Sequence, residues 1–127
     1  MKPIRILLFF LLPTIASAVE YNCKVEKKYN NEGIYSPTDL QRWQFSVVIE
    51  ENGAKAYLSR CSFSLIKQAV TCDRYEVDKI VFDDNVKIKK FYVFSSQFDV
   101  QLFHNLSFIE NNGRGDIAYG KCNLVSP

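Results

Sequence analysis

Four cysteines constrain the fold of this chain more than any other feature. Cys23, Cys61, Cys72 and Cys122 all follow an N-terminal segment with the layout of a secretory leader. An even number of cysteines in an exported domain predicts disulfides, and four cysteines allow three pairings. We favour Cys61–Cys72, which would close a short hairpin, and Cys23–Cys122, which would tie the first strand to the last.

The leader is recognised from the order of its parts. A short basic start with Lys2 and Arg5 precedes an unbroken apolar run, Ile6–Leu12, and small residues in an A-x-A pattern follow. This is the order of a signal peptide, and the run is shorter than the ~20 residues of a membrane helix. We therefore expect residues 1–18 to be cleaved, and residues 19–127 to form a single secreted or periplasmic domain.

The mature chain has no net charge to attract a polyanion. The full sequence has 16 Lys and Arg residues against 14 Asp and Glu residues, and Lys2 and Arg5 belong to the leader. Nucleic acids and anionic membranes both require a basic surface, so we expect neither as a partner. No later segment approaches the ~20 apolar residues of a membrane helix, which predicts no stable membrane insertion once the leader is removed.

Alternation of apolar and polar residues predicts an all-β domain. In the first stretch Tyr21, Cys23 and Val25 fall on one face, whereas Lys24 and Lys28 fall on the other. This period of two is typical of a half-buried antiparallel strand. Several such stretches separated by turns predict a small antiparallel up-and-down sheet of about eight strands, curled into a barrel or a flattened sandwich and stapled by disulfides.

Two changes of phase predict irregular strands. After a hairpin turn at Asn52-Gly53, Leu58 lies on one phase and Cys61 on the other, so we expect a β-bulge near Ser59-Arg60. A second irregularity is expected near Asp78-Lys79 for the same reason.

Two further strands allow predictions, one about side-chain direction and one about close packing. The lysines of the segment from Val86 to Lys89 are expected to face solvent and protect a sheet edge. In the last strand, the small residues Ala118 and Gly120 are expected to admit a neighbouring strand or a large ring.

The longest irregular segment, Asn30–Gln41, is the natural place for recognition. Ser36 and Pro37 are typical of a helix start, so we expect about one helical turn there, followed by a strand that begins at Trp43. Because exposed loops often carry function, Tyr35, Arg42 and Trp43 are our candidate contacts with a partner. A plain surface connection is the alternative. The expected partner is an envelope or extracellular protein, and the expected state is a monomer.

The sequence offers little enzyme chemistry. A catalytic triad would need the single histidine, His104, and no serine lies in a G-x-S-x-G motif. Oxidised cysteines are not nucleophiles, and no two cysteines have the C-x₂-C spacing of a zinc site. We expect a non-enzymatic protein with no catalytic residue, no metal ligand and no cofactor.

Two short motifs have functional and structural interpretations. Arg114-Gly115-Asp116 is the tripeptide displayed by integrin-binding proteins, but a hairpin flank explains it equally. Asn105-Leu106-Ser107 is a glycosylation sequon, which matters only in a eukaryotic secretory route. The short basic start and compact A-x-A end of the leader favour a bacterial host, in which the sequon is inert.

Two functions are compatible with these features. The first is a non-enzymatic protein-binding or inhibitor module, stapled against conditions outside the cytoplasm. The second is a carrier of a small apolar ligand in an aromatic-lined barrel, since the chain has 10 Phe and 7 Tyr residues. A barrel this short tends to be filled by its own side chains, so we favour the binding module.

Overall fold

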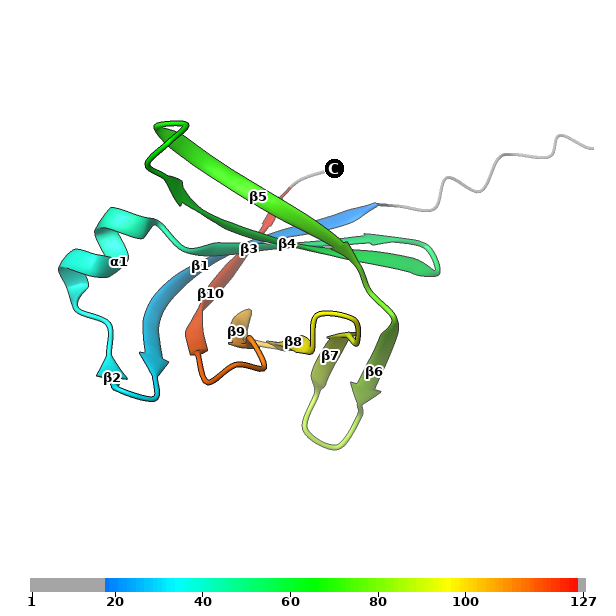
Figure 1. Ribbon diagram of the computed structural model, residues 1–127. Coiled ribbons are helices and arrows are strands. Elements are labelled where there is room, and N and C mark those ends of the chain that lie inside the picture. Colours follow the sequence, from blue (N-terminus) through cyan, green and yellow to red (C-terminus); the bar gives the residue numbers. More distant parts are fainter. Residues whose placement is uncertain (1–17, 126–127) are drawn as a thin grey trace, which may run out of the picture.

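The computed structural model describes residues 18–125, which form one antiparallel sheet curled into a half-barrel (Figure 1). The predicted all-β fold is confirmed. The predicted signal peptide lies outside the described residues, apart from Ala18. Among residues 18–125, no helix has the length and apolar character needed to cross a membrane. The elements in chain order are β1 Val19–Asn30, β2 Gly33–Ile34, α1 Pro37–Trp43, β3 Ser46–Asn52, β4 Lys55–Ser64, β5 Ala69–Glu76, β6 Lys79–Asp83, β7 Ile88–Val93, β8 Phe98–Phe103, β9 Ser107–Asn111 and β10 Ile117–Val125.

The two edge strands of the sheet are consecutive in the chain. The strand order is β5-β4-β3-β1-β10-β9-β8-β7-β6, and β2 pairs with β1. Between the edges, the N–H of Val77 donates to the carbonyl of Ala56 on β4, and the N–H of Asp78 donates to that of Tyr92 on β7. The chain therefore crosses from one edge to the other at a single corner. The irregularity predicted near Asp78-Lys79 is this corner.

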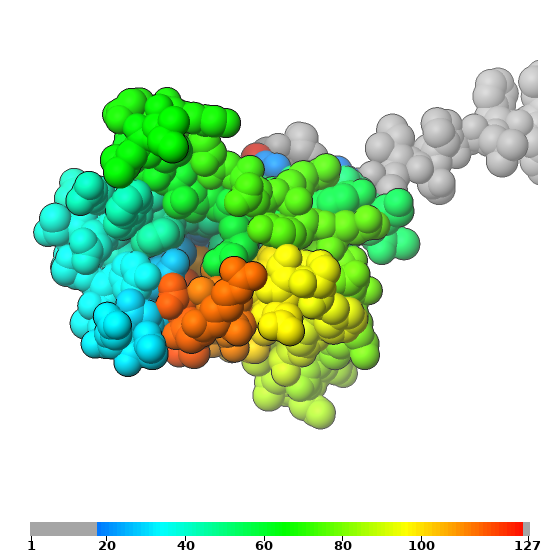
Figure 2. Space-filling model, in the orientation of Figure 1, coloured from blue at the N-terminus to red at the C-terminus, as the bar shows by residue number. Residues whose placement is uncertain are grey.

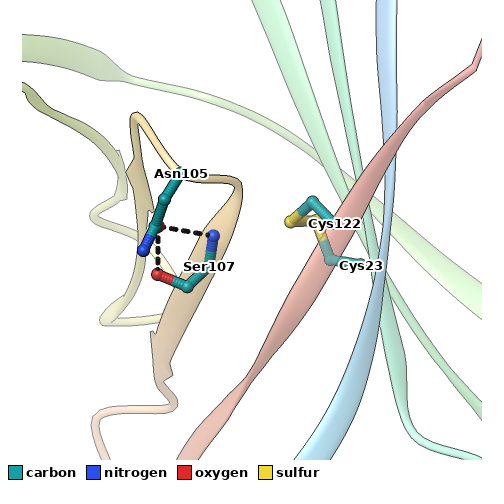
Figure 3. Close-up of a disulfide and its surroundings, with 4 residues drawn as sticks. All are labelled: Cys23, Asn105, Ser107 and Cys122. Carbon is teal, nitrogen blue, oxygen red and sulfur yellow. Dashed lines mark hydrogen bonds between the residues drawn. A yellow bond between two sulfur atoms is a disulfide. The ribbon is translucent and has the colours of Figure 1, made fainter.

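Both predicted disulfides are present, and each joins residues directly opposed on neighbouring strands. Cys23 on β1 and Cys122 on β10 have their Cα atoms 3.9 Å apart (Figure 3). The N–H of Cys122 donates to the carbonyl of Leu106, away from β1, so this pair is of the close, non-hydrogen-bonded type. Cys61 on β4 and Cys72 on β5 are 4.1 Å apart in the same opposed arrangement.

The concave side of the sheet holds the core. Its largest fully buried side chains are Phe91, Phe108, Ile49 and Leu58, which come from both halves of the chain. The interior is therefore filled by the protein's own side chains. This filling argues against the carrier alternative, which requires an open lumen.

Gly120 on β10 is confirmed as a point of close approach. A Cβ atom there would overlap the carbonyl oxygen of Lys24 and would lie 2.7 Å from Cε1 of Phe108. The other four glycines of the chain have positive φ, whereas Gly120 does not. Steric room, and not backbone conformation, therefore requires glycine at this strand position.

Replacing Gly120 by alanine is expected to lower the free energy of unfolding by about 1–3 kcal/mol, because a methyl group must displace backbone or an aromatic ring. Urea denaturation of the purified variant measures this change. Lys121→Ala, at the exposed neighbouring position, is the control and should stay within about 0.5 kcal/mol of wild type. Equal stability of Gly120→Ala and wild type would contradict the close approach.

The predicted outward direction of Lys28 is wrong, because β1 contains a β-bulge. The register with β10 shifts between Val25 and Lys27, so one extra residue lies on β1. Beyond the bulge the phase is reversed, and Lys28 lies opposite the buried Ala118. A bulge reverses the direction of the side chains that follow it. In a run of consecutive polar residues, such as Glu26-Lys27-Lys28, the alternation pattern does not reveal this reversal.

The bulge predicted near Ser59-Arg60 is also wrong. The register of β4 with both neighbours runs without a break through this segment. Arg60 consequently keeps the phase of Ala56 and Leu58 and points to the concave side, whereas Cys61 takes the opposite phase. The change of hydrophobic phase came from a charged residue in an inward position, and not from an inserted residue.

The segment before β3 is more helical than expected. Ser36 caps α1 by accepting the N–H of Asp39 at 3.1 Å, as its sequence predicts. The helix then continues through Trp43 and ends at Gln44, which has left-handed backbone angles. The strand expected to begin at Trp43 therefore begins two residues after Gln44. The helix thus includes Trp43, although the alternation from Trp43 onward is typical of a strand.

The lysines predicted to face solvent divide between two directions. Lys87 is exposed, as expected. Lys89 is different, because it shares the phase of the buried Phe91 and Val93 and forms an ion pair with Glu51 on β3. The expectation for Lys89 is therefore wrong, and the buried residues that follow it on β7 explain its direction.

Candidate functional site

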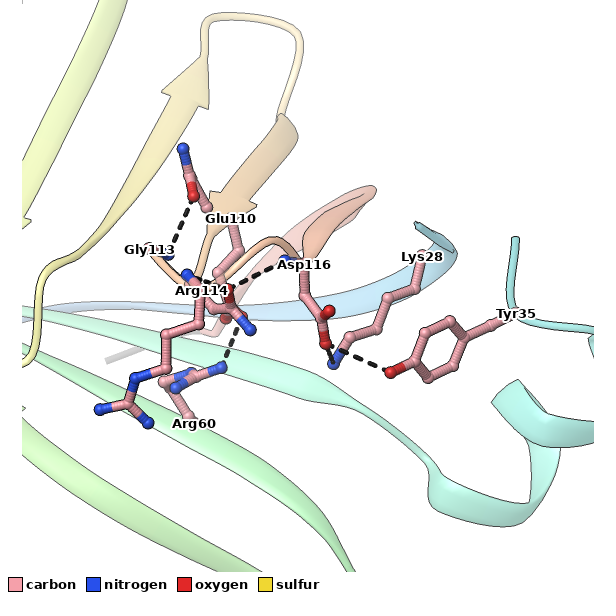
Figure 4. Close-up of polar contacts among 9 residues, drawn as sticks. Lys28, Tyr35, Arg60, Glu110, Gly113, Arg114 and Asp116 are labelled. Atoms are coloured by element: carbon pink, nitrogen blue, oxygen red, sulfur yellow. Dashed lines mark hydrogen bonds and ion pairs between the residues drawn. The ribbon is translucent and has the colours of Figure 1, made fainter. Parts of the chain in front are cut away.

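Four charged side chains, which contact one another in two ion pairs, gather at one mouth of the half-barrel (Figure 4). Three of them line a cleft of about 220 Å³ together with a further charged residue, Asp73, and the fourth, Asp116, lies beside it. Lys28 comes from β1, Arg60 from β4, Glu110 from β9 and Asp116 from the loop before β10. We call this group the polar cleft. It is brought together by sheet positions far apart in the sequence. The cleft is lined by Val25, Lys28, Phe45, Ser46, Arg60, Cys61, Ser62, Asp73, Glu110 and Ala118.

Arg60 and Glu110 form the deeper ion pair of the cleft. The guanidinium Nη2 lies 3.2 Å from Oε1 of the carboxylate, and the two side chains are 29% and 7% exposed. The guanidinium also lies 5.1 Å from the ring centroid of Phe98. Glu110 faces the core side of β9, so the charge of Arg60 compensates a carboxylate that water reaches poorly.

Lys28 lies between two aromatic rings and two carboxylates of the cleft. Its side chain is 9% exposed, its Nζ lies 3.7 Å from the ring centroid of Phe45, and the distance to Oδ2 of Asp116 is 3.9 Å. Burial lowers the pKa of the amine, and the positive charge of Arg60 adds to this, whereas Glu110 and Asp116 act in the opposite direction. The balance is a lowered pKa, because burial is the largest of these effects.

Asp116 is held in place by its own loop and by Tyr35. The side-chain oxygen of Asn112 accepts the N–H groups of Arg114 and Asp116 at 2.8 and 3.0 Å, which fixes the turn. The hydroxyl of Tyr35 donates to Oδ2 of Asp116 at 3.2 Å (Figure 4). Burial raises the pKa of the Tyr35 hydroxyl, so it remains a donor at neutral pH. The Asp of the Arg114-Gly115-Asp116 motif is thus engaged inside the protein, which argues against the adhesion interpretation.

The hairpin of β4 and β5 projects from the body above the polar cleft. In Figure 2 the hairpin, in green, stands over the α1 segment in cyan, and the surface is hollowed between these segments and the orange loop before β10. The Cys61–Cys72 disulfide cross-links the hairpin. The tip of the hairpin carries Ile66, which is 96% exposed, and the exposed Leu65 and Val70 lie next to the tip. An apolar tip on a cross-linked hairpin is a feature that a partner surface would bury.

A groove of about 580 Å³ separates α1 from this hairpin. Leu40 and Phe45 contribute apolar surface on the helix side, and Val70 contributes it on the hairpin side. Val25 also lines the groove, and the remaining lining side chains are polar. They come from β1 (Asn22 and Lys24), α1 and its C-cap (Gln41 and Gln44), β3 (Ser46) and β10 (Asn123). The helix, the groove and the hairpin tip together form what we call the recognition face.

The structure separates the three predicted contact residues. Arg42 and Trp43 lie in the last turn of α1, where the guanidinium carbon is 5.1 Å from the Trp43 ring, and they belong to the recognition face. Tyr35 lies beside the polar cleft, packed edge-to-face on Phe45 and bonded to Asp116. Contact with a partner remains a prediction for all three residues, and Tyr35 also has this internal role.

Sequence reasoning missed the residues of the polar cleft. Lys28 was assigned to the solvent face because the bulge in β1 has no sequence signal. Arg60 does have a sequence signal, because a charged residue in phase with Ala56 and Leu58 indicates either a bulge or an inward charge. Glu110 precedes an Asn-rich turn, and its inward direction follows from the phase of the buried Phe108.

The other singled-out residues lie away from this region. His104 is exposed in the turn after β8. Asn105, the first residue of the sequon, is also exposed, and its side-chain oxygen accepts the N–H and hydroxyl of Ser107 at 3.0 and 2.6 Å (Figure 3). Within the described part of the chain, no group of three or more His, Cys, Asp or Glu side chains is arranged to hold a metal ion.

Comparison with models of protein families, with curated proteins and with solved structures finds no match for this chain. The recognition face and the polar cleft are therefore the features from which we infer its function.

Proposed function

We propose that the chain is an exported, non-enzymatic protein-binding module of the inhibitor type. Its β4–β5 hairpin inserts into a groove of an envelope or extracellular protein. The observation that carries this proposal is the 96% exposure of Ile66 at the tip of a disulfide-linked hairpin. Two disulfides are also compatible with an oxidising compartment outside the cytoplasm.

A cross-linked hairpin is suited to binding because little order has to be gained on association. The Cys61–Cys72 disulfide restricts the two strands before any partner arrives, which reduces the entropy lost when the tip is immobilised. Full burial of an isoleucine side chain stabilises a complex by about 1.5–3 kcal/mol. Ile66 can therefore contribute most of its apolar surface to a partner.

The α1 side of the recognition face offers a second anchor. Trp43 and Arg42 lie against each other in the last helical turn, and Trp and Arg are enriched among the residues that dominate binding energy. The groove is lined on the helix side by Leu40, Gln41 and Gln44, which flank this pair in the sequence, so a partner segment in the groove would contact α1 and the hairpin together.

Replacing Ile66 by aspartate is expected to abolish partner capture without changing the thermal midpoint of unfolding. The side chain makes few contacts within the protein, and a charge at the tip opposes burial in an apolar partner groove. The measurement is retention of envelope or culture-medium proteins on the immobilised mature domain, identified by mass spectrometry.

Val86→Asp is the matched control, because Val86 is an exposed apolar residue in the distant turn between β6 and β7. A protein retained by wild type and by Val86→Asp, lost with Ile66→Asp and reduced with Trp43→Ala, supports the proposal. Retention that Ile66→Asp leaves unchanged refutes it.

A further inference from the structure

We propose that the free edge of β5 is a docking site for an extended strand of the partner protein, which adds to the sheet in antiparallel orientation. Strand addition at this edge deepens the proposed function and rests on it, because it names the element of the partner that the β4–β5 hairpin binds. The backbone of β5 makes the contact, and not the apolar tip at Ile66, so tip binding and edge binding can be tested separately.

β5 is an edge strand without the usual protection. It pairs with β4 from Ala69 to Glu76 without a bulge, and among the described residues no strand lies on its other side. Natural proteins protect exposed edges with lysine, proline or a bulge, and the eight residues of β5 contain none of these. The other edge strand, β6, is shorter, with five residues, and begins with Lys79. β5 is therefore the edge that is open to a further strand.

The pairing with β4 identifies the unpaired backbone groups of β5. The N–H of Val77, one residue beyond β5, donates to the carbonyl of Ala56 on β4 at 2.8 Å. In an antiparallel pair every second residue bonds to its neighbour in this way, so the N–H and carbonyl groups of Val70, Cys72 and Arg74 point away from β4. No turn, loop or side-chain hydrogen bond of residues 18–125 involves these groups. They form a row of donors and acceptors for an added strand.

The disulfide holds this row in place. The Cα atoms of Cys61 and Cys72 are 4.1 Å apart, the spacing of a non-hydrogen-bonded pair, which agrees with the outward direction of the Cys72 backbone groups. The bridge keeps β5 on β4 along the hairpin that projects from the body (Figure 1). A strand that is already ordered loses little conformational entropy when a partner adds to it. In strand addition, backbone hydrogen bonds give affinity and alternate side chains give specificity.

Asp73, on the concave face of β5, favours a basic residue in the added strand. Its carboxylate lines the polar cleft and belongs to no ion pair of the described residues, since Arg60, opposite it on β4, is paired with Glu110. A residue of the added strand opposite Asp73 would form a non-hydrogen-bonded pair, in which side chains lie closest. Lysine or arginine there gains a carboxylate, whereas an acidic residue is repelled.

Tyr75 favours an apolar residue at the next position on the same face. Its ring packs edge-to-face on Phe98, with 5.0 Å between the ring centroids, and the side chain is half-buried. An apolar side chain of the added strand opposite Tyr75 would extend this contact. In an antiparallel strand that position lies two residues before the one opposite Asp73. The expected ligand is therefore an extended segment with the order apolar, any residue, basic.

The test uses a phage-displayed library of random decapeptides, selected on the immobilised mature domain. Enriched sequences are expected to contain the apolar-x-basic order. A synthetic peptide of the enriched sequence should bind Arg74→Pro about tenfold more weakly than Arg74→Ala, because proline removes one free N–H. Edge strands tolerate proline at such a position, since no bond to β4 is lost. Arg74→Ala controls for the side chain, which is paired with Glu50.

A second pair of variants, Val70→Pro and Val70→Ala, repeats this comparison at another free N–H. Hydrogen exchange is the independent readout, because the bound peptide should slow exchange at the amides of Val70, Cys72 and Arg74. Asp73→Asn should weaken binding about two- to fivefold through loss of its charge. Glu76→Gln is the matched control, since Glu76 lies on the opposite phase of the same strand and should leave peptide affinity unchanged.

Ile66→Asp should bind the peptide as wild type does. Capture of a partner protein that is lost with Ile66→Asp therefore reports on the tip, and peptide binding that is lost with Arg74→Pro reports on the edge. Enrichment of no peptide, or equal affinities of Arg74→Pro and Arg74→Ala, overturns the proposal. So does a wild-type dimer in sedimentation that Arg74→Pro abolishes, because the edge then belongs to a second copy of this chain. A circular-dichroism melt of each variant excludes unfolding as the cause.

Discussion

Replacement of both Cys23 and Cys122 by alanine is expected to lower the free energy of unfolding by about 4–5 kcal/mol. The two cysteines are 99 residues apart, so their disulfide closes nearly the whole described chain into a loop and strongly restricts the unfolded state. They also join β1 to β10, the middle strand of the nine in the sheet order. Urea denaturation of the variant with its remaining disulfide intact measures the loss.

The matched control is the double variant Cys61→Ala and Cys72→Ala. This disulfide spans 11 residues within one hairpin, so its removal is expected to cost about 2–3 kcal/mol. Both bridges have the same opposed geometry, so the difference between the two double variants reports the loop-length effect together with the lost packing of Cys23 and Cys122, which are buried in the core whereas Cys72 is exposed. A larger loss from the hairpin disulfide than from Cys23–Cys122 would contradict this account.

Replacement of Arg60 by methionine is expected to lower the free energy of unfolding by about 3 kcal/mol. The change leaves the Glu110 carboxylate, which is 7% exposed, without its cation on the concave side of the sheet. We place the expectation at the low end of the range for buried pairs because Arg60 itself is partly open to the polar cleft. Chemical denaturation at neutral pH measures the effect.

Two further variants separate charge burial from loss of packing. Arg60→Met combined with Glu110→Leu should recover most of the stability, since the unpaired carboxylate is then absent. Arg74→Met breaks an ion pair of the same length, 3.2 Å to Glu50, in an exposed position and should cost about 1 kcal/mol or less. Equal losses for Arg60→Met and Arg74→Met would show that burial of Glu110 has no energetic consequence.

The architecture was predictable from the sequence because most of it follows from local rules. Alternation located the strands, and Ser36-Pro37 located the helix start. The two disulfide pairings were predictable because Cys61 and Cys72 lie in one hairpin, and Cys23 and Cys122 lie in the first and last strands. The small residue at Gly120 correctly indicated close packing before its neighbour, the Phe108 ring, was known.

The polar cleft was not predictable because it depends on register. One extra residue in β1 reverses the direction of Lys28. The position of this residue is a matter of backbone register between β1 and β10, which the side chains of β1 alone do not indicate. Arg60 occupies a position where the alternation predicts an apolar side chain. Its partner Glu110 is 50 residues away, so the alternation within one strand does not reveal the pair. Paired inward charges of this kind resemble irregularities until the partner strand is placed.

The sheet order predicts a sequence of events during folding. The strands from β3 to β5 and from β6 to β10 are consecutive hairpins, so each series can zip together through short-range closures. Pairing of β1 with β10 brings together the two ends of the described chain and is the entropically slow step. Formation of the Cys23–Cys122 disulfide is therefore expected only after β1 has paired with β10, late in folding. The Cys61–Cys72 disulfide can form earlier, once its own hairpin has closed.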